Sequence, residues 1–399
     1  MSGPVAGSVG DSVTGRTGAA GPLEEGPART ARRSVPVAAP VPAGASSVRA
    51  TGRAWAELLR VSALFTVPGD LLAGAAAGGH RPDHRTLLAT CSSLCLYEAG
   101  MALNDWADRG IDAVERPGRP LPSGRIRPAA AFAAASGLTA AGLALAAAAG
   151  RPALLTGTAL AGTVWAYDLY LKNTPAGPAA MACARALDLL QGAVATGPRH
   201  IAGAPTTAGP LRQAAGARRR AFAALPSAAL LGAHTLAVTT VSRREAHGSS
   251  AGLPLTGLAA VAAVARAGAG RSRTAAPSST PVPRRTGTVL ATSRPAGTVR
   301  RLSRAVSAAL PRAVRDTPAT TAVTAALVAG YTATAARPLL QAALNPSPYF
   351  LQRAVGGGIR AMIPLQAALT ARAGAPGTGA ALLALIPAAR RLSRKVSPT

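Results

Sequence analysis

Acidic side chains are scarce in this sequence. Only 15 of the 399 residues are Asp or Glu, against 43 Lys or Arg, and the formal net charge is +28 at pH 7. All charged residues together make up 15% of the chain, whereas an ordinary soluble domain carries about 25%. Because a membrane interior enforces such a deficit of charge, the composition argues against a set of ordinary soluble domains.

Cysteine and aromatic residues are also few. Cys91, Cys95 and Cys183 all lie in apolar runs, and their spacing matches neither a zinc site nor a disulfide framework. We interpret them as small buried apolar residues. Aromatic residues make up 3% of the chain, so alanine and glycine carry much of the 49% hydrophobic content. Small residues let helices approach closely in lipid, and the composition therefore predicts packed membrane helices.

The excess of positive charge has two interpretations. A basic chain attracts the phosphates of nucleic acid. Here, however, the arginines are concentrated in the N-terminal tail, in one low-complexity stretch and at the ends of apolar segments. Membrane proteins place positive charge at such positions, facing the cytoplasm and anionic lipid. We therefore predict the lipid bilayer and no nucleic acid as a partner, and a multi-pass location in the cell membrane.

Apolar runs recur along the chain, and most are long enough to cross a bilayer. We expect a disordered basic tail over residues 1–52, the first membrane helices over 53–265, an Arg-, Ser-, Thr- and Pro-rich connection over 266–318, and the remaining membrane helices with a basic C-terminus over 319–399. No apolar run near the start suits a cleaved signal peptide. The expected runs are Trp55–Ala77, Thr86–Leu103, Ala129–Ala149, Ala153–Leu171, Ala176–Gly197, Phe222–Val241, Leu253–Ala265, Ala319–Leu340, Val355–Ala371 and Gly377–Ala389. Because the shortest need not span, we predict an all-α polytopic bundle of about nine transmembrane helices.

The few acidic residues gather in one segment, 104–124, which reads NDWADRGIDAVERPGRPLPSG. If this segment is helical, Asp105, Asp108 and Asp112 lie within about 60° of one another around the helix axis. Three carboxylates on one face repel one another unless a cation lies among them, and hard oxygen ligands suit Mg²⁺. The arginines that follow suit an anionic ligand, since guanidinium groups bind phosphate oxygens bidentately. The segment predicts a Mg²⁺ site at a helix end near the membrane surface, with a solvated acidic face as the alternative.

The same residues suggest a substrate. A diphosphate bridged by a metal ion is a good leaving group, because the metal neutralises the charge that develops as it departs. The neighbouring apolar spans would accommodate a hydrocarbon chain. The combination points to a substrate with a diphosphate head and a lipid tail.

Three ionisable residues are expected at membrane depth. Asp70, Arg185 and Asp188 lie inside apolar runs, where charge is costly and is by default a functional candidate. A helix break at Pro68-Gly69 is the alternative explanation for Asp70. A structural ion pair is the alternative for Arg185 and Asp188, which are three residues apart.

The motifs resemble a known family. Asn104, Asp105, Asp108 and Asp112, followed by R-P-x-R-P and a glycine at Gly124, resemble the first aspartate-rich motif of the UbiA superfamily of intramembrane prenyltransferases. The segment 167–192, with Y-x-x-x-x-K-x-x-P and Arg185, is similar to the family's connection between its fourth and fifth helices. The resemblance covers about residues 54–389. It implies a helical bundle whose cavity opens to the bilayer under two aspartate-rich caps on the cytoplasmic side.

The second aspartate-rich motif departs from the family. Where the family has D-x-x-x-D after its sixth span, this chain has SRREAHG over residues 242–248, with a single carboxylate. The segment resembles the S-R-x-E-x-x-G variant of the EboC-like branch of the superfamily. In this interpretation Glu245 still ligates a metal ion and Arg243 or Arg244 binds phosphate directly.

The resemblance implies a mechanism and leaves an alternative. Mg²⁺ held by the three aspartates, with Asn104 as a supporting ligand, would bind a prenyl diphosphate donor, and Arg116, Arg119 and Lys172 would share the phosphate charge. The allylic cation would form in a dry apolar cavity and be attacked by an unidentified small-molecule acceptor, commonly an aromatic ring in this superfamily. Residues expected to orient the acceptor are Asp70, Arg185 and Asp188. The alternative is a catalytically reduced member that binds a lipid or aromatic precursor as a carrier or transport subunit of a biosynthetic cluster.

Overall fold

The computed structural model describes residues 43–60, 65–195, 210–270 and 318–387. All contacts reported below lie within the compact unit that begins at Ser47. In these ranges every regular element is a helix, as expected for an all-α fold. The tail before residue 43, the connection over 271–317 and the C-terminal residues after 387 lie outside the described residues, so what the sequence predicts for them stays a prediction.

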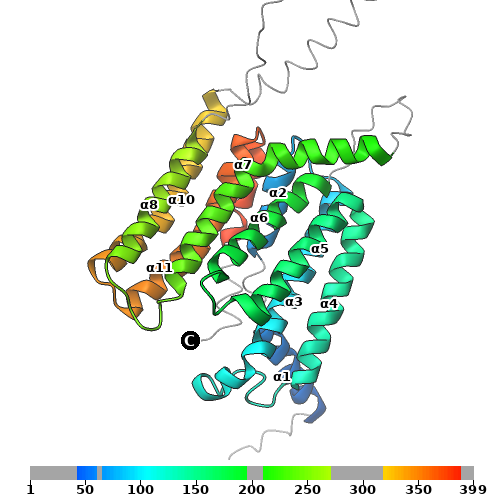
Figure 1. The fold of residues 1–399 in the computed structure, drawn as a ribbon, viewed down its shortest axis with the longest axis vertical. Helices are drawn as coiled ribbons and strands as arrows, with labels where there is room; N and C mark the ends of the chain where they lie inside the picture. The colour runs from blue at the N-terminus through cyan, green and yellow to red at the C-terminus, as the bar shows by residue number, and fades with distance from the viewer. Residues whose placement is uncertain (1–42, 61–64, 196–209, 271–317, 388–399) are drawn as a thin grey trace, which may run out of the picture. The chain divides into compact units, whose positions relative to one another are not determined.

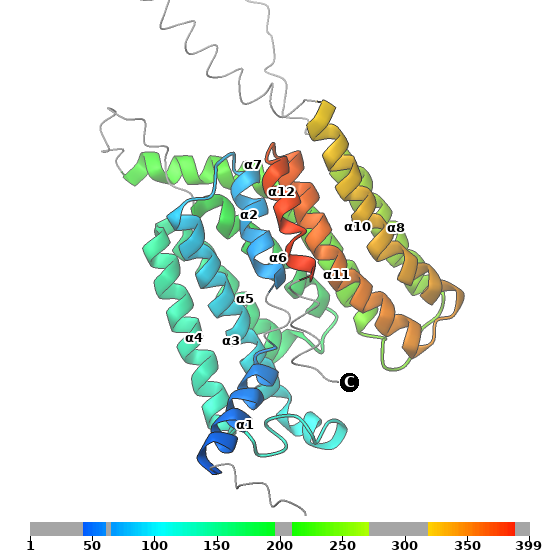
Figure 2. The same ribbon diagram turned by 180° about the vertical axis from the view of Figure 1, so that it is seen from behind.

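Figures 1 and 2 show the helices from two opposite sides, labelled and coloured by their order in the chain. They are α1 (Ala43–Leu58), α2 (Val67–Ala77), α3 (His84–Glu115), α4 (Pro128–Ala149), α5 (Arg151–Ala166), the π-helical turn η2 (Tyr167–Leu171), α6 (Gly177–Ala195), α7 (Pro210–Ser242), α8 (Gly252–Ala269), α10 (Pro318–Leu344), α11 (Pro348–Arg372) and α12 (Pro376–Leu382). Helix α3 packs against α4, α6 packs against α2, α5 and α7, and α10 packs against α8 and α11.

Four of these helices are long and apolar enough to cross a membrane. They are α3, α4, α7 from Gln213 onward, and α8. The protein is therefore a helical membrane protein of several spans. The expected number of about nine spans stays a prediction, because the other described helices are shorter or less apolar than a single continuous span requires.

The N-terminal boundaries differ from those expected. Helix α1 begins at Ala43, so the last ten residues of the predicted disordered tail, 43–52, are helical. The run expected as one span, Trp55–Ala77, contains the end of α1 and a separate α2. Hydropathy alone missed this break because the residues on both sides of it are apolar. Pro68 lies in the first turn of α2, where a missing backbone N–H costs little, so it starts this helix.

Helix α3 carries the acidic segment inside its last turns. The helix begins with a capping box, in which the Asp83 carboxylate accepts hydrogen bonds from the backbone N–H groups of Arg85 and Thr86, each at 3.0 Å. It continues beyond the expected end at Leu103 and stops before Arg116-Pro117, because proline disfavours a helical residue ahead of it. The three aspartates therefore lie on a helix, as the spacing argument required.

Two later boundaries also shift. The short run expected at Leu253–Ala265 is a complete helix, α8, so the predicted connection begins after residue 269 and not at 266. Helix α11 begins at Pro348, ahead of the expected Val355, and its glycines at 356–358 are helical. Composition placed both boundaries wrongly because arginine and glycine occur inside these helices as well as between them.

Glycine allows α2 and α6 to pack with their backbones in contact. A Cβ atom at Gly192 of α6 would overlap the carbonyl oxygen of Leu71, and one at Gly74 of α2 would overlap that of Leu189. Small residues at a helix crossing allow such an approach in a membrane protein. This crossing fixes α6, and with it one wall of the cavity described below.

We expect Gly192→Ala to destabilise the protein by about 1–3 kcal/mol, because the added methyl group has to displace backbone. Thermal unfolding in detergent measures the effect. Gly137→Ala on α4 is the matched control, since a Cβ there meets nothing within 4 Å. That control should gain about 0.5–1 kcal/mol from the better helix former. Equal effects of both substitutions would contradict the close helix crossing.

Candidate functional site

The acidic end of α3 lies at the same end of the helix bundle as α1 and the loop that leads to α4, as Figure 1 shows. Leu121 and Ile126 of this loop pack with Leu58 of α1 and Leu103 of α3 in one apolar cluster. Gly124 adopts a φ of 72°, which a residue with a side chain rarely adopts, and so allows the turn. The packing holds the arginines of the loop over the aspartates of α3.

Asp105 and Asp112 share one arginine. Arg119 Nη1 lies 3.3 Å from Asp105 Oδ1 and 2.7 Å from Asp112 Oδ2. Arg60, which follows α1, places its Nη2 3.2 Å from the same Asp105 oxygen. Both aspartates are buried. Two arginines from distant parts of the chain therefore neutralise them.

Asp108 faces the segment after α5. Lys172 Nζ lies 2.6 Å from Asp108 Oδ1. Just before Lys172, the π-helical turn η2 positions Asp168, whose Oδ1 accepts a hydrogen bond of 3.1 Å from Asn104 Nδ2. A π-helical turn inserts one residue into a helix and is frequent at functional sites. Asn104 and Lys172, both predicted site residues, are thus brought to the same place.

Sequence reasoning missed Asp168 and Arg60. Asp168 is 4% exposed and lines the cavity described below. Its signal was present, because any acidic residue inside an apolar run of such a base-rich chain is notable. Arg60 carried no such signal, since nothing in its surroundings connects it with Asp105, 45 residues later.

The segment 242–248 comes close to the first motif. Burial raises the pKa of the Glu245 carboxyl, and the positive charge of Arg116 partly offsets this effect. Arg243 Nη1 donates hydrogen bonds to the carbonyl oxygens of Lys172, at 3.0 Å, and Thr174, at 2.6 Å. The side chain expected to bind phosphate thus fixes the loop that carries Lys172.

The three residues expected at membrane depth form one buried network. Arg185 pairs with Asp70 through Nη1 and donates through Nη2 to Thr66 Oγ1 at 2.7 Å. Gln366 of α11 donates to Asp70 Oδ1 at 2.6 Å. Asp188 lies 3.9 Å from Arg185. Arg185 and Asp188 line the cavity described below, whereas Asp70 is not among its lining residues. The functional roles expected for the three residues stay predictions.

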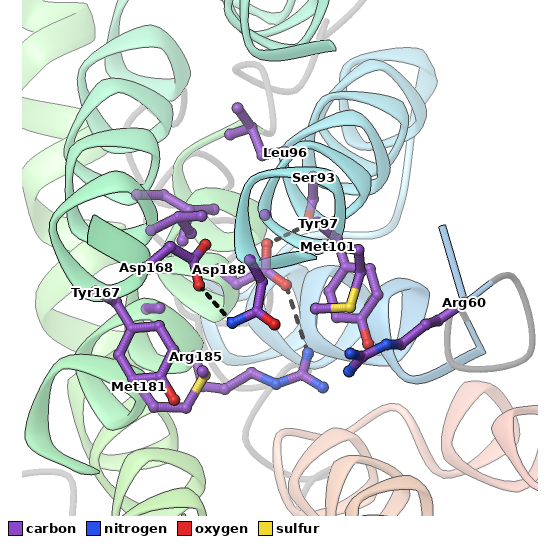
Figure 3. A pocket seen from close by; sticks show the side chains of 15 residues that line it. Arg60, Ser93, Leu96, Tyr97, Met101, Tyr167, Asp168, Met181, Arg185 and Asp188 are labelled. Carbon is purple, nitrogen blue, oxygen red and sulfur yellow. Dashed lines mark hydrogen bonds and ion pairs between the residues drawn. The ribbon is translucent and has the colours of Figure 1, made fainter. Parts of the chain in front are cut away.

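The cavity between these groups has a volume of about 220 Å³ and is drawn in Figure 3. Its polar lining residues include Asn104, Asp168, Arg60, Ser93 and Asp188. We call the Asn104–Asp168 pair its outer end, because Asn104 adjoins the acidic segment of α3, and the Ser93–Asp188 pair, earlier on α3, its inner end. The wall between them is mainly apolar and includes Leu96, Met101, Leu160, Val164 and Met181. The arrangement can hold an anionic head at one end and a hydrocarbon along its length.

The aspartates can bind a magnesium ion with fewer carboxylates than the sequence predicts. The described residues contain no group of three or more His, Cys, Asp or Glu side chains that could hold a metal ion. Arg119 lies between Asp105 and Asp112, and Asp108 is paired with Lys172, so the three carboxylates do not meet at one point. Mg²⁺ in proteins commonly uses only one or two carboxylates and completes its octahedron with waters and substrate phosphates. The donor set suits that arrangement.

The sequence matches the model of a known protein family. The model described as the UbiA prenyltransferase family matches residues 62–276, which include every lining residue of the cavity except Arg60. The chain belongs to the UbiA prenyltransferase family.

Individual relatives match shorter stretches. The digeranylgeranylglyceryl phosphate synthase of Methanopyrus kandleri is 37% identical over 128 residues, which cover 31% of this chain and 45% of the relative. The protoheme IX farnesyltransferase of Acidiphilium cryptum is 40% identical over 92 residues, which cover 22% of this chain and 29% of the relative. A solved structure of a digeranylgeranylglyceryl phosphate synthase covers 81% of this UbiA-family chain and 99% of its own, with 15% identity and a TM-score of 0.49. The chain thus spans less than half the length of these curated relatives, and the resemblance to the EboC-like branch stays a prediction.

Proposed function

We propose that this UbiA-family protein is an enzyme of the cell membrane that transfers a prenyl group from a prenyl diphosphate to an acceptor, assisted by Mg²⁺. The observation that carries the proposal is that three aspartates, paired with Arg60, Arg119 and Lys172, lie on α3 directly beyond Asn104, which lines an apolar cavity. Carboxylates and cations together suit a diphosphate with bound metal, and the apolar wall suits the prenyl chain.

The residues of the site have different proposed roles. Asp105, Asp108 and Asp112 would hold Mg²⁺ through one or two of their carboxylates, with Asn104 in support, and a bound magnesium ion supplies positive charge to a departing diphosphate. Lys172 and Arg119 each carry a cationic group within 3.3 Å of an aspartate, so they add charge at the place where the diphosphate leaves. Val164 and Met181 would exclude water from the allylic cation, and Leu160 would contact the prenyl chain deeper in the cavity. Arg116 and Glu245 extend the charged rim, and Arg243 positions Lys172.

Two kinds of acceptor are supported, each by a different observation. An aromatic ring is the acceptor we predict from the superfamily resemblance. The name of the Methanopyrus kandleri relative favours an alcohol, since a glyceryl phosphate receives prenyl groups through its oxygens. In either case the acceptor has to reach the first carbon of the prenyl group, beside the diphosphate. The assignment of Asp70, Arg185 and Asp188 to the acceptor stays a prediction.

A carrier without catalysis is the second candidate. It is favoured by the segment 242–248, which has one carboxylate and an arginine engaged with backbone carbonyls. Such a protein would bind a prenyl diphosphate or its product but would not break the bond between carbon and oxygen.

Diphosphate release separates the two candidates. The full chain in lipid nanodiscs is incubated with Mg²⁺, an acceptor mixture and geranyl, farnesyl or geranylgeranyl diphosphate, and the diphosphate and the prenylated product are quantified. We expect Asp105→Ala and Asp108→Ala each to lower the rate by about 10²–10³-fold. Exposed Glu57, which pairs with Arg125, provides the control Glu57→Gln. If wild type releases no more diphosphate than the Asp105/Asp108 double variant, the enzyme is excluded in favour of the carrier.

A further inference from the structure

Two hydrogen-bonded pairs mark the ends of the cavity. Asn104 of α3 donates to Asp168 at the outer end, and Ser93 of α3 donates to Asp188 of α6 at the inner end. Both pairs use α3, and eleven residues separate Ser93 from Asn104 along it. At a rise of 1.5 Å per residue, the two ends are about 16 Å apart.

The lining residues of the other two walls cover about 10–12 Å of this interval, at a rise of 1.5 Å per residue. On α6, Met181 and Ala184 line the cavity on the way inward to Asp188. On α5, Val164 and Leu160 follow at one and two turns from Asp168. Apolar side chains therefore occupy the interval on all three helices, and polar groups occur at both of its ends.

The inner end is lined by a network of ion pairs and hydrogen bonds. Arg185 joins Asp188 to Asp70, and Gln366 joins Asp70 to the carbonyl oxygen of Thr66 at 2.7 Å. Together with Ser93, these contacts connect α2, α3, α6 and α11. An alkyl group pressed against this network would remove water from Asp188 and Arg185 without providing a hydrogen bond in return. The network therefore resists a longer chain both sterically and electrostatically.

We propose that the Ser93–Asp188 pair is a floor that limits the prenyl donor to three isoprene units, an inference that rests on the proposed prenyl transfer. Asp105 and Asp108 lie one residue and one turn beyond Asn104, so a chain whose diphosphate is held there enters the cavity near Asn104. Three main-chain bonds span about 3.3–3.6 Å when extended, so a four-bond isoprene unit spans about 5 Å. Three units fill the interval of about 16 Å. A fourth unit, as in a geranylgeranyl group, meets the floor.

Binding of a chain-length series tests the floor without requiring turnover. The dissociation constants of geranyl, farnesyl and geranylgeranyl diphosphate are measured with Mg²⁺ on the full chain in nanodiscs. We expect farnesyl diphosphate to bind at least about tenfold more tightly than geranyl diphosphate, since five more carbons are buried. Geranylgeranyl diphosphate should bind no more tightly than farnesyl diphosphate.

Substitutions near the floor should shorten or lengthen the prenyl chain that the cavity accepts. Ala184→Leu fills the cavity one turn above Asp188 and should weaken farnesyl binding about tenfold while leaving geranyl binding within about twofold. Leu160→Ala opens space at the same depth and should strengthen geranylgeranyl binding about tenfold. Ala179→Leu, on the exposed face of α6, is the matched control and should change none of the three constants.

The outcomes separate the floor from the proposed function. A further gain from farnesyl to geranylgeranyl as large as the gain from geranyl to farnesyl would show that the tail leaves the cavity sideways, and would overturn the floor alone. The same holds if Ala184→Leu weakens all three donors equally. Failure of all three donors to bind would overturn both the floor and the prenyl-transfer proposal.

Discussion

Lys172→Met is expected to lower the rate of prenyl transfer by about 10²–10³-fold while leaving the protein folded. Lys172 is 12% exposed and lies 2.6 Å from Asp108, at the place where the diphosphate would leave. Methionine keeps most of the length and apolar stem of lysine and removes only the charge. Since Asp108 is 25% exposed, water can replace its lost partner, and the free energy of unfolding should fall by no more than about 1 kcal/mol.

Steady-state transfer and thermal unfolding, measured on the same preparation, check this prediction. Arg109→Met is the matched control, because Arg109 neighbours Asp108 in sequence and lies over the ring of Trp106, where it does not line the cavity. The control should keep its rate within about threefold, since an exposed charge outside the cavity is screened by salt. Equal losses in the two variants would mean that only the total charge at this end of the protein matters.

The first motif could be predicted from sequence because its information is local. Asp105, Asp108 and Asp112 belong to one helix, so their spacing alone places them near the same end of it, and Arg119, which neutralises Asp112, follows seven residues later. The family assignment was confirmed for the same reason, because a contiguous motif is recognisable without any tertiary contact.

The partners of these residues were not predictable in the same way. Arg60 meets Asp105 across 45 residues, and Gln366 meets Asp70 across 296. Helix periodicity states which residues share a face but not which distant face they meet. Asp70 shows the consequence, since it is buried inside the protein but its partner on α11 was not expected.

Hydropathy is local information, and it places some helix boundaries well and misses others. Hydropathy places the apolar helices α4 and α6 within two residues of their observed ends. It fails at α1 and α2, where the chain breaks between two apolar stretches, and at the arginine-containing end of α8. In such a chain, composition identifies membrane helices but does not show where one stops and the next begins.

Arg185→Gln is expected to be the most destabilising of the substitutions considered, by about 3–5 kcal/mol. Asp70 is completely buried and Asp188 is 4% exposed, so removing Arg185 leaves two carboxylates without their shared cation. The hydrogen bonds from Gln366 and Ser93 remain but do not neutralise charge. Breaking a buried ion pair in this way exposes the full cost of burying a charge.

A double-mutant cycle distinguishes this cost from simple loss of packing. Asp70→Asn combined with Arg185→Gln removes one carboxylate with the cation, so the double variant should be more stable than Arg185→Gln alone by about 1–3 kcal/mol. The exposed pair between Glu57 and Arg125 provides the comparison, because Glu57→Gln there should cost less than about 1 kcal/mol. If Arg185→Gln costs no more than Glu57→Gln, the network is not the structural support of the cavity floor. If the double variant loses as much free energy of unfolding as the two single variants together, the cost of Arg185→Gln lies in packing. An unpaired charge would instead be relieved in the double variant, which removes Asp70's carboxylate together with its cation.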